Sequence, residues 1–590
     1  MDRKPMNTRR MKSAIAATAV LAVLLSACGG NSNNNSGSSG GSAKAEFNAG
    51  LTGVVSPSDK KGGIVKFADE SAPDSVDTGD TYYGSQWDMV RLYSRALTMF
   101  TVAPGDASKK LVGDLAEGLG TPSDSAKTWT YKIRKGVKFE DGTVITSKDV
   151  KYGISRSTDK GIFPDGPTYY DTMLNWPAGY KGPYKTPTMN TDSAISTPDD
   201  NTIVFHLKAP FAGFDYLAMT PQTAPVPQKG DQGAKQKQHY ISSGPYMFAS
   251  YSDGKSYTLK RNPNWDPATD PNRKALPDGI DMQMNVDAED IDNRLISGDV
   301  DVALAGTGVT AASQSRVLSD PALKARADNP TLSRLWYTSI NPTVPPFDNI
   351  ECRKAIEYAM DKTSYQTAFG GEFAGGALAT TLMPPIVPGY KQFDLYSTPD
   401  GKGDLTKAKE SLTKCGQPNG FSTNISYRNE RPKEKATAEA FQQQLAKIGI
   451  KVTPKGFPKK DYFSTYAGNP PYVKKNGLGL VVNGWGADWN DGFGFLSQIT
   501  DSRVIRDTGG SSNTSVRIPA VDKLLDQAQA ETDVAKREAI WSQVDQMVME
   551  QAVIYPGVYA KSLLLRGKNL TNVFVNPQLG MYDYLALGKP

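Results

Sequence analysis

The sequence is poor in the residues that build metal and redox sites. Only two histidines and three cysteines occur among 590 residues, so neither a His-rich nor a Cys-rich metal site can be assembled. The chain after residue 27 also has almost no net charge, because residues 1–27 carry +4 of the formal net charge of +5. The near-neutral remainder offers no basic strip for phosphate backbones, and we expect no metal and no nucleic-acid partner.

Catalytic motifs are equally scarce. The only Gly-x-Ser-x-Gly match, residues 37–41, lies in a Gly- and Ser-rich stretch and reflects composition. No phosphate-binding glycine loop and no dinucleotide fingerprint follows a predicted strand, so no cofactor is expected. His206 and His239 are both expected to be solvated. We therefore predict that the chain is not an enzyme, with a secreted hydrolase as the alternative of a different class.

No apolar run is long enough to span a membrane. Residues 14–25 form an apolar stretch of twelve residues, whereas a spanning helix needs about 20. The stretch follows a basic segment ending at Lys12, which is typical of a secretion signal, here residues 1–27. An ordinary signal peptide is one reading of this pattern.

The residues Leu25-Ser26-Ala27-Cys28 resemble the lipobox of bacterial lipoproteins. The resemblance implies cleavage before Cys28 and a diacylglyceryl group on its sulfur. The alternative is a chance cysteine behind an ordinary signal. Residues 28–59 are assigned to a flexible tether, because Gly, Ser and Asn dominate the stretch up to residue 43.

The rest of the chain has the composition of an ordered globular protein. Hydrophobic residues make up 38% and charged residues 22%, enough apolar side chain for a large core. Alternation predicts strands at residues 129–134, 203–207 and 300–304. Caps and helical spacing predict helices that begin near Lys148 and Asp404. Alternating helices and short strands indicate α/β lobes with helix-covered sheets.

One stretch, residues 159–190, is rich in Pro, Gly and Tyr. Regular elements resume on both sides of it, so it is not a linker between domains. We predict a long surface excursion there.

Six sequence blocks follow one another along the chain. The first combines Thr128-Trp129-Thr130-Tyr131-Lys132-Ile133-Arg134-Lys135-Gly136-Val137-Lys138-Phe139 with Asp141-Gly142-Thr143. The others lie at residues 243–265, 298–301, 346–362, 445–452 and 484–489. Together they resemble the large solute-binding proteins of bacterial ABC importers, the oligopeptide-, dipeptide- and nickel-binding family, or extracellular solute-binding protein family 5. Any one block could arise by chance, but six in order could not.

The resemblance implies an α/β fold with two lobes of the periplasmic-binding-protein type (type II), an additional inserted domain and a ligand cleft between the lobes. The expected limits are residues 60–105, 222–335 and 555–590 for lobe I, 106–221 for the inserted domain and 336–554 for lobe II. Each lobe offers half of a site, so ligand favours closure.

The resemblance also implies a biological role. We expect a monomer, lipid-anchored on the extracytoplasmic face of the cell membrane, that captures short peptides or another small solute and delivers them to ABC transporter permease subunits. An oligosaccharide is the alternative ligand, because aromatic walls also stack on sugar rings.

The densest candidate for ligand contact is Trp485-Gly486-Ala487-Asp488-Trp489, which follows an apolar run at residues 478–482. This order predicts a strand that ends at the cleft. In peptide-binding relatives the Asp of this motif pairs with the ligand's α-amine, and the match carries that role to Asp488. A carboxylate in a water-poor cleft binds ammonium through a charge-assisted hydrogen bond. The alternatives are that Asp488 only caps the next turn and that Trp485 is core.

Two departures from the family pattern concern the ligand's carboxylate. Asn490-Asp491-Gly492 stands where relatives usually carry Asp-Pro or Glu-Pro, and Val482 stands where some peptide binders carry Arg. The partner of a C-terminal carboxylate therefore stays open. Arg428 and Arg431 are the candidates, and a solvated loop is the alternative.

An aromatic cluster in lobe I is the candidate for the opposite wall of the cleft. It consists of Tyr82, Tyr83 and Trp87. These rings either line the cleft or pack the lobe I sheet.

Two further cysteines remain once Cys28 carries lipid. Cys352 and Cys415 both belong to the predicted lobe II, and an exported protein folds where disulfides persist. We expect a disulfide between them. Each also lies on the apolar stripe of its own predicted helix, so two separate buried thiols are the alternative.

Overall fold

A computed structural model describes residues 42–43 and 46–590. The predicted signal peptide at residues 1–27 and the lipidation site Cys28 lie outside the described residues. The residues that are described belong to one compact unit, residues 41–590. Within them, no helix combines the length and apolar character needed to cross a bilayer.

A five-stranded sheet has the order β10-β11-β12-β3-β13. Its strands are β3 (Ile64–Ala68), β10 (Tyr246–Ser252), β11 (Ser256–Arg261), β12 (Gly279–Gln283) and β13 (Val302–Ala303). Strand β3 runs parallel to both of its neighbours. Helix α6 (Ala288–Ser297) ends at Gly298, whose φ of 95° lies in the left-handed region that glycine tolerates. Strand β13, which follows, lies within the strand predicted at residues 300–304.

A four-stranded antiparallel sheet, order β6-β7-β9-β8, lies in the region predicted as the inserted domain. Its strands are β6 (Thr121–Ser123), β7 (Thr128–Lys132), β8 (Ile195–Asp199) and β9 (Thr202–His206). Helix α3 (Ser147–Ser157) starts with a capping box between Thr146 and Asp149. Local signals thus predicted β7, β9 and this helix start correctly.

The stretch at residues 159–190 is the predicted surface excursion only in its second half, because residues 166–170 and 173–174 are buried whereas residues 175–190 are almost all exposed or half-buried. It contains helix α4 (Tyr169–Met173), in which Tyr169 and Tyr170 are 1% and 0% exposed. Buried aromatic rings supply enough apolar area to pull a Pro- and Gly-rich segment into the core. The correction matters because this helix reaches the candidate site.

A six-stranded sheet has the order β16-β20-β15-β19-β17-β18. Its strands are β15 (Thr331–Ile340), β16 (Gly376–Leu378), β17 (Ser422–Arg428), β18 (Lys451–Phe457), β19 (Leu480–Gly486) and β20 (Ile554–Lys561). Leu332 and Trp336 of β15 join one core, whereas Leu335 and Tyr337 join another. Both faces of the sheet are buried, which explains its continuous apolar runs. The lobe limit expected at residues 335/336 falls inside β15, and the domain limits stay a prediction.

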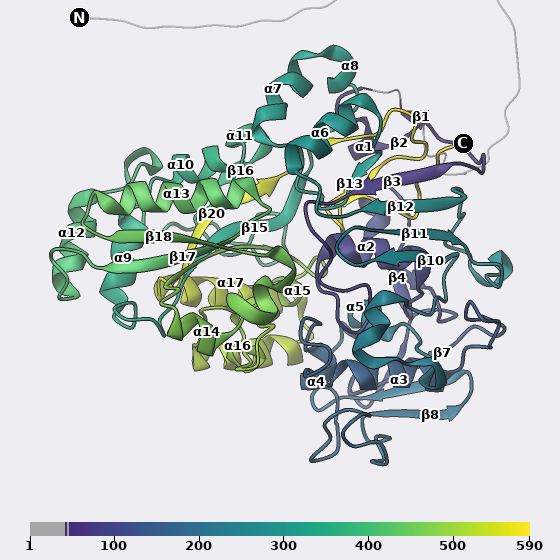
Figure 1. Cartoon of the computed structure of the whole chain (residues 1–590). Coiled ribbons are helices and arrows are strands. Elements are labelled where there is room, and N and C mark those ends of the chain that lie inside the picture. Colours follow the sequence, from purple (N-terminus) through teal and green to yellow (C-terminus); the bar gives the residue numbers. More distant parts are fainter. Residues whose placement is uncertain (1–41, 44–45) are drawn as a thin grey trace, which may run out of the picture. The chain divides into compact units, whose positions relative to one another are not determined.

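Helices cover both faces of this sheet (Figure 1). One core contains residues of α9 (Ile350–Ala359), α10 (Lys362–Ala368), α12 (Leu405–Lys414) and α13 (Pro432–Ala446). The other contains residues of α15 (Gly492–Thr500), α16 (Pro519–Ala530) and α17 (Val534–Glu550). Asp404 caps α12 as predicted, and Asn349 caps α9.

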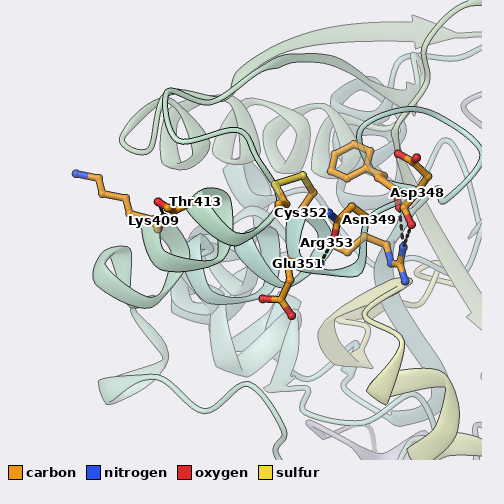
Figure 2. The surroundings of a disulfide bond; sticks show 9 residues. Asp348, Asn349, Glu351, Cys352, Arg353, Lys409 and Thr413 are labelled. Atoms are coloured by element: carbon orange, nitrogen blue, oxygen red, sulfur yellow. Dashed lines mark hydrogen bonds between the residues drawn. A yellow bond between two sulfur atoms is a disulfide. The ribbon is translucent and has the colours of Figure 1, made fainter.

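A disulfide joins α9 to the end of α12. Cys352 and Cys415 are bonded, with their Cα atoms 5.4 Å apart (Figure 2). Beside it, Arg353 donates from Nη1 to the carbonyl of Phe347 at 2.6 Å and from Nε to the carbonyl of Gln551 at 2.9 Å. The start of α9 is therefore fixed both to α12 and to the end of α17.

The segment predicted as a tether, residues 28–59, folds onto the body in its described second part. β1 (Ser42–Ala43) pairs with β2 (Val54–Val55), and α1 (Ala49–Thr52) lies between them. Val55 exchanges backbone hydrogen bonds with Val573, and Gly50 donates its N–H to Asp328 at 2.8 Å. Ala49 and Val55 are each 4% exposed. Burial of these apolar side chains stabilises the segment against the body, and the Gly- and Ser-rich sequence before it has few such side chains.

The remaining elements are short. They are α2 (Gly84–Tyr93), β4 (Thr98–Phe100), β5 (Leu111–Gly113), α5 (Phe214–Leu217), α7 (Ala311–Ser319), α8 (Pro321–Lys324), β14 (Ala327–Asp328), α11 (Gly371–Ala374), α14 (Pro470–Lys475), β21 (Leu564–Leu565), β22 (Val575–Asn576) and β23 (Met581–Tyr582).

Candidate functional site

A cavity of about 150 Å³ lies where the loop before α2 faces the ends of β15, β17 and β19. Most of the residues predicted from the sequence to contact ligand line this cavity. Those that line it are Tyr82, Tyr83, Trp87, Arg428, Arg431, Trp485, Gly486 and Asp488. We call this space the central cavity.

Two glycines shape the sheet wall of the central cavity. A Cβ at Gly484 would lie 2.1 Å from the ring of Trp336, so only glycine lets that indole lie flat across β19. Arg334 pairs with Gly486 across the β15–β19 ladder. A Cβ at Gly486 would lie 3.4 Å from Nε of Arg334, which places this guanidinium directly over the strand end.

Asp488 follows β19 and carries the central carboxylate of the site. Its Oδ2 accepts hydrogen bonds from the hydroxyls of Tyr82 and Tyr169, each at 2.6 Å. Its Oδ1 has no hydrogen-bond partner among the described residues. Burial raises the pKa of Asp488 to about 7, although the two hydroxyls lower it. One carboxylate oxygen is thus held in place and the other is available to a donor.

Tyr169 is a site residue that the sequence reasoning missed. It comes from α4, 319 residues before Asp488 in the chain. The only signal was the tyrosine-rich composition of residues 159–190, and composition says nothing about long-range contacts.

Trp489 lies outside the central cavity, so the expectation that it contacts ligand is not met. It is fully buried, with its ring 5.3 Å from Tyr169 and 5.9 Å from Tyr216. Its Nε1 donates to Asp491, which also accepts from the backbone N–H of Gly494 and caps α15. The capping role considered for Asp488 therefore belongs to Asp491.

Aromatic rings line the side of the central cavity next to Asp488. Tyr82 stacks on Trp87 with ring centroids 5.5 Å apart and meets Trp485 edge-on at 5.8 Å. Tyr83 donates its hydroxyl to the backbone carbonyl of Lys459 at 3.3 Å. These rings form an apolar wall that excludes water from the carboxylate.

The two arginines that the sequence offered are already engaged. Arg428 makes a two-pronged ion pair with Glu434, and Arg431 lies 3.3 Å from the same carboxylate. Burial raises the pKa of Glu434, but the charges of Arg428 and Arg431 outweigh it and leave this pKa lowered. Glu434 is therefore ionised and serves both guanidinium groups.

Arg334 is the cation that the sequence reasoning overlooked. It lines the central cavity, yet its guanidinium makes no hydrogen bond or ion pair among the described residues. It lies 5.6 Å from the ring of Trp336. Burial, and then the charges of Arg431 and Arg428, lower its pKa to about 10. Arg334 is the only charged residue of strand β15, and this lone charge in an apolar strand is the sequence signal that could have identified it.

Comparison with known proteins places this arrangement in a family. The profile described as bacterial extracellular solute-binding proteins, family 5, matches residues 110–506, more than half of the chain. The chain belongs to this family. A curated relative, the glutathione-binding protein GsiB of Escherichia coli K12, is 26% identical over 80% of this chain and 86% of its own.

Solved structures agree with this assignment. The clavulanic acid biosynthesis oligopeptide binding protein 2 is 40% identical, covers 93% of this chain and 99% of its own, and has a TM-score of 0.83. The oligopeptide-binding protein AppA of Bacillus subtilis, solved with a nonapeptide, is 20% identical, covers 90% and 99%, and has a TM-score of 0.72. The two-lobed type II fold is therefore established.

Membership also defines the general role. This family 5 protein is an extracytoplasmic substrate-binding component of an ABC importer and not an enzyme. The central cavity is then the candidate site for the solute.

Proposed function

We propose that this family 5 protein captures short peptides, with Asp488 as the anchor for the free amine. The observation that carries the proposal is the enclosed carboxylate of Asp488, fixed through Oδ2 by two tyrosine hydroxyls and, among the described residues, unpartnered at Oδ1. An ammonium group at Oδ1 would form a charge-assisted hydrogen bond in a site shielded from water. Peptides in two relatives' structures and glutathione in another relative's name support this ligand class.

The free guanidinium of Arg334 is the partner for the peptide's C-terminal carboxylate. It replaces Arg428, whose donors already serve Glu434. An arginine can hold a carboxylate through two parallel hydrogen bonds, which fixes orientation as well as affinity. Asp488 then binds the amino end of the peptide and Arg334 its carboxyl end.

Closure of the two lobes would complete the site. Asp488 follows β19 of the six-stranded sheet, whereas Tyr82 precedes α2 beside the five-stranded sheet. An open form lacks the contact between them, so a ligand bound at Asp488 favours the closed form.

We further propose that Cys28 carries the lipid anchor and that the closed protein delivers its solute to a permease. The lipobox-like sequence supports the anchor, and family membership supports delivery. One diacylglyceryl group supplies two acyl chains, the number that stable anchoring generally requires. Cys28→Ser is expected to release the protein from membranes or to leave its signal uncleaved. Normal membrane retention of that variant would disprove the anchor.

The peptide proposal is tested with Asp488→Asn, which keeps the shape of the side chain and removes its charge. The variant is expected to lose roughly thirtyfold or more in affinity for free-amine peptides, since a desolvated charge partner contributes about 2 to 5 kcal/mol. N-acetylated peptides, which lack the ammonium, are expected to lose little. Titration calorimetry measures both. Equal losses for free and acetylated peptides would contradict the amine anchor.

A thermal-shift screen defines the ligand class independently. Peptides, glutathione and oligosaccharides are compared, because a ligand that binds only the folded state raises the melting temperature. Stabilisation by peptides supports the proposal. Stabilisation by oligosaccharides alone would replace the substrate class and leave only the transport role.

A further inference from the structure

Three guanidinium groups lie on the sheet side of the central cavity, and within the part of the chain that the structure describes only two of them pair with a carboxylate. We call Arg334, Arg428 and Arg431 the arginine wall. Among the described residues, Glu434 is the only acid within ion-pair distance of any of them. The wall therefore carries two positive charges more than its ion-pair partner balances. The carboxylate of Glu70 also acts electrostatically on Arg431, together with Lys459 and Lys433, but makes no ion pair with the wall.

The imbalance lies at groups that are partly shielded from water, since Arg334 and Arg431 are half-buried. Arg431 keeps an Nε that is buried and has no hydrogen-bond partner among the described residues. Both Arg334 and Arg431 lie against the Trp336 ring, at 5.6 and 5.8 Å. Buried like charges without counter-charges are unfavourable, and an incoming anion relieves both the repulsion and the missing hydrogen bonds.

The other charged groups that line the central cavity do not cancel this excess. Asp74 accepts from Thr81 and from the backbone N–H of Tyr82, so the loop before α2 occupies it. Lys460 lies 3.7 Å from Asp253 and is partly exposed. Asp165 lines the cavity from the segment before α4 and has interactions of its own. The cavity is thus polarised, with Asp488 beside the aromatic rings and the arginine wall on the sheet.

We infer that the preferred ligand is an amine-bearing dicarboxylate of the short acidic peptide class, with its C-terminal carboxylate on Arg334 and an acidic side chain on Arg431. The inference rests on the proposed function, in which Asp488 takes the amine. A ligand with one amine and two carboxylates matches the charges of the cavity, whereas a neutral dipeptide leaves one guanidinium unsatisfied. Electrostatic complementarity of this kind sets both specificity and binding orientation.

Matched peptide pairs test the inference, because glutamate and glutamine differ in charge but hardly in shape. The probes are Ala-Glu against Ala-Gln, Glu-Ala against Gln-Ala, and Ala-Glu-Ala against Ala-Gln-Ala. Titration calorimetry is expected to show at least one Glu peptide binding about tenfold or more tightly than its Gln partner. Raising the salt concentration should shrink this preference, but only in part, since the site is enclosed.

Three variants of the arginine wall test which guanidinium group holds which carboxylate. Arg431→Gln is expected to reduce the Glu preference to within about twofold, because it removes the partner of the acidic side chain. Arg334→Gln removes the partner of the C-terminal carboxylate, which both members of a pair share, so it should weaken Glu and Gln peptides alike. Arg334→Lys, which keeps the charge but loses the planar fork, should weaken both by less. Arg503→Gln makes the same charge change at a half-exposed arginine of the α15–α16 region, paired with Asp501 and Asp526, and should leave the preference intact. Melting curves confirm that each variant is folded.

The possible outcomes distinguish this inference from the proposed function on which it rests. Equal affinities within every Glu and Gln pair would overturn the dicarboxylate preference while leaving peptide binding in place. A Glu preference that survives Arg431→Gln would also overturn it, because the second carboxylate would then bind elsewhere. Failure of every peptide to bind would reject the proposed function itself.

Discussion

Asp488 is held in place by hydrogen bonds and also has a raised pKa. Tyr82 and Tyr169 fix its position, and burial raises its pKa to about 7. Near neutral pH this carboxylate is therefore close to half ionised when no ligand is bound. An ammonium ligand would favour the ionised form, so binding and proton release are linked.

This linkage predicts a pH dependence of peptide affinity. About half of the Asp488 carboxylates are ionised at pH 7 and about a tenth at pH 6, so free-amine peptides should bind about fivefold more weakly at pH 6. Calorimetry at the two pH values measures the change. Burial also raises the pKa of Asp74, to about 6, so Asp488→Asn serves as the control that isolates Asp488. A pH profile unchanged by Asp488→Asn would contradict the prediction.

The same shift predicts how the ligand-free protein responds to pH. The folded state holds the Asp488 proton more tightly than the unfolded state, whose carboxylate has the ordinary pKa of 3.8. The stabilising contribution of this proton is therefore present at low pH and is lost as the pH rises from about 4 through 7. Relative to Asp488→Asn, the parent protein should lose unfolding free energy over this range in urea titrations. A constant difference between the two proteins would count against the raised pKa.

Residue-level prediction from sequence succeeded where a motif carried the information. The order Trp485 to Asp488 marked the strand end and the carboxylate correctly as parts of one cavity. Arg334 and Tyr169 escaped because their importance arises from long-range packing: one faces Gly486 across a ladder and the other reaches in from α4. No local pattern encodes such distances.

At the scale of elements, α9 and α12 depend on a covalent link. Cys352 is fully buried, and the disulfide to Cys415 closes a loop with a sequence separation of 63. In the chain-entropy account, a cross-link of this length stabilises the fold by about 4 kcal/mol by restricting the unfolded chain.

The double substitution Cys352→Ser and Cys415→Ser is therefore expected to lower the melting temperature substantially in scanning calorimetry. A reductant should shift the parent protein in the same direction and leave the double variant unchanged, which separates the disulfide from the effect of serine itself. If neither the double substitution nor the reductant changed the melting temperature, the disulfide would add nothing to stability.

Helix boundaries were largely readable from sequence because caps act locally. Thr146 with Asp149, Asp404 and Gly298 fix their helix ends through neighbouring backbone groups. The extent of the predicted tether was not readable, since residues 46–59 are held by Asp328 and Val573, far along the chain. Local chemistry sets element ends, whereas tertiary contacts decide which segments join the body.

At the scale of the molecule, a buried ion pair links segments that follow different sheets. Lys459, after β18, places its ammonium 3.0 and 2.9 Å from the two carboxylate oxygens of Asp69, after β3, and both side chains are 3% exposed. Lys433 of α13 also donates to the carbonyl of Thr307 at 3.0 Å. These contacts tie the segments after the five-stranded and six-stranded sheets together beside the central cavity.

Lys459→Met is expected to shift the protein toward an open form. It keeps the apolar stem but leaves the Asp69 carboxylate buried without its partner, a change that typically costs about 3 to 5 kcal/mol. Apparent peptide affinity should fall, because only the closed fraction binds well, and X-ray scattering should report a larger radius of gyration without ligand that returns to the parent value at saturation. Lys455→Met removes the same charge from an exposed position on β18 and should change neither measurement. If Lys459→Met matched the parent in both, closure would have to rest on the tyrosine contacts to Asp488 rather than on this ion pair.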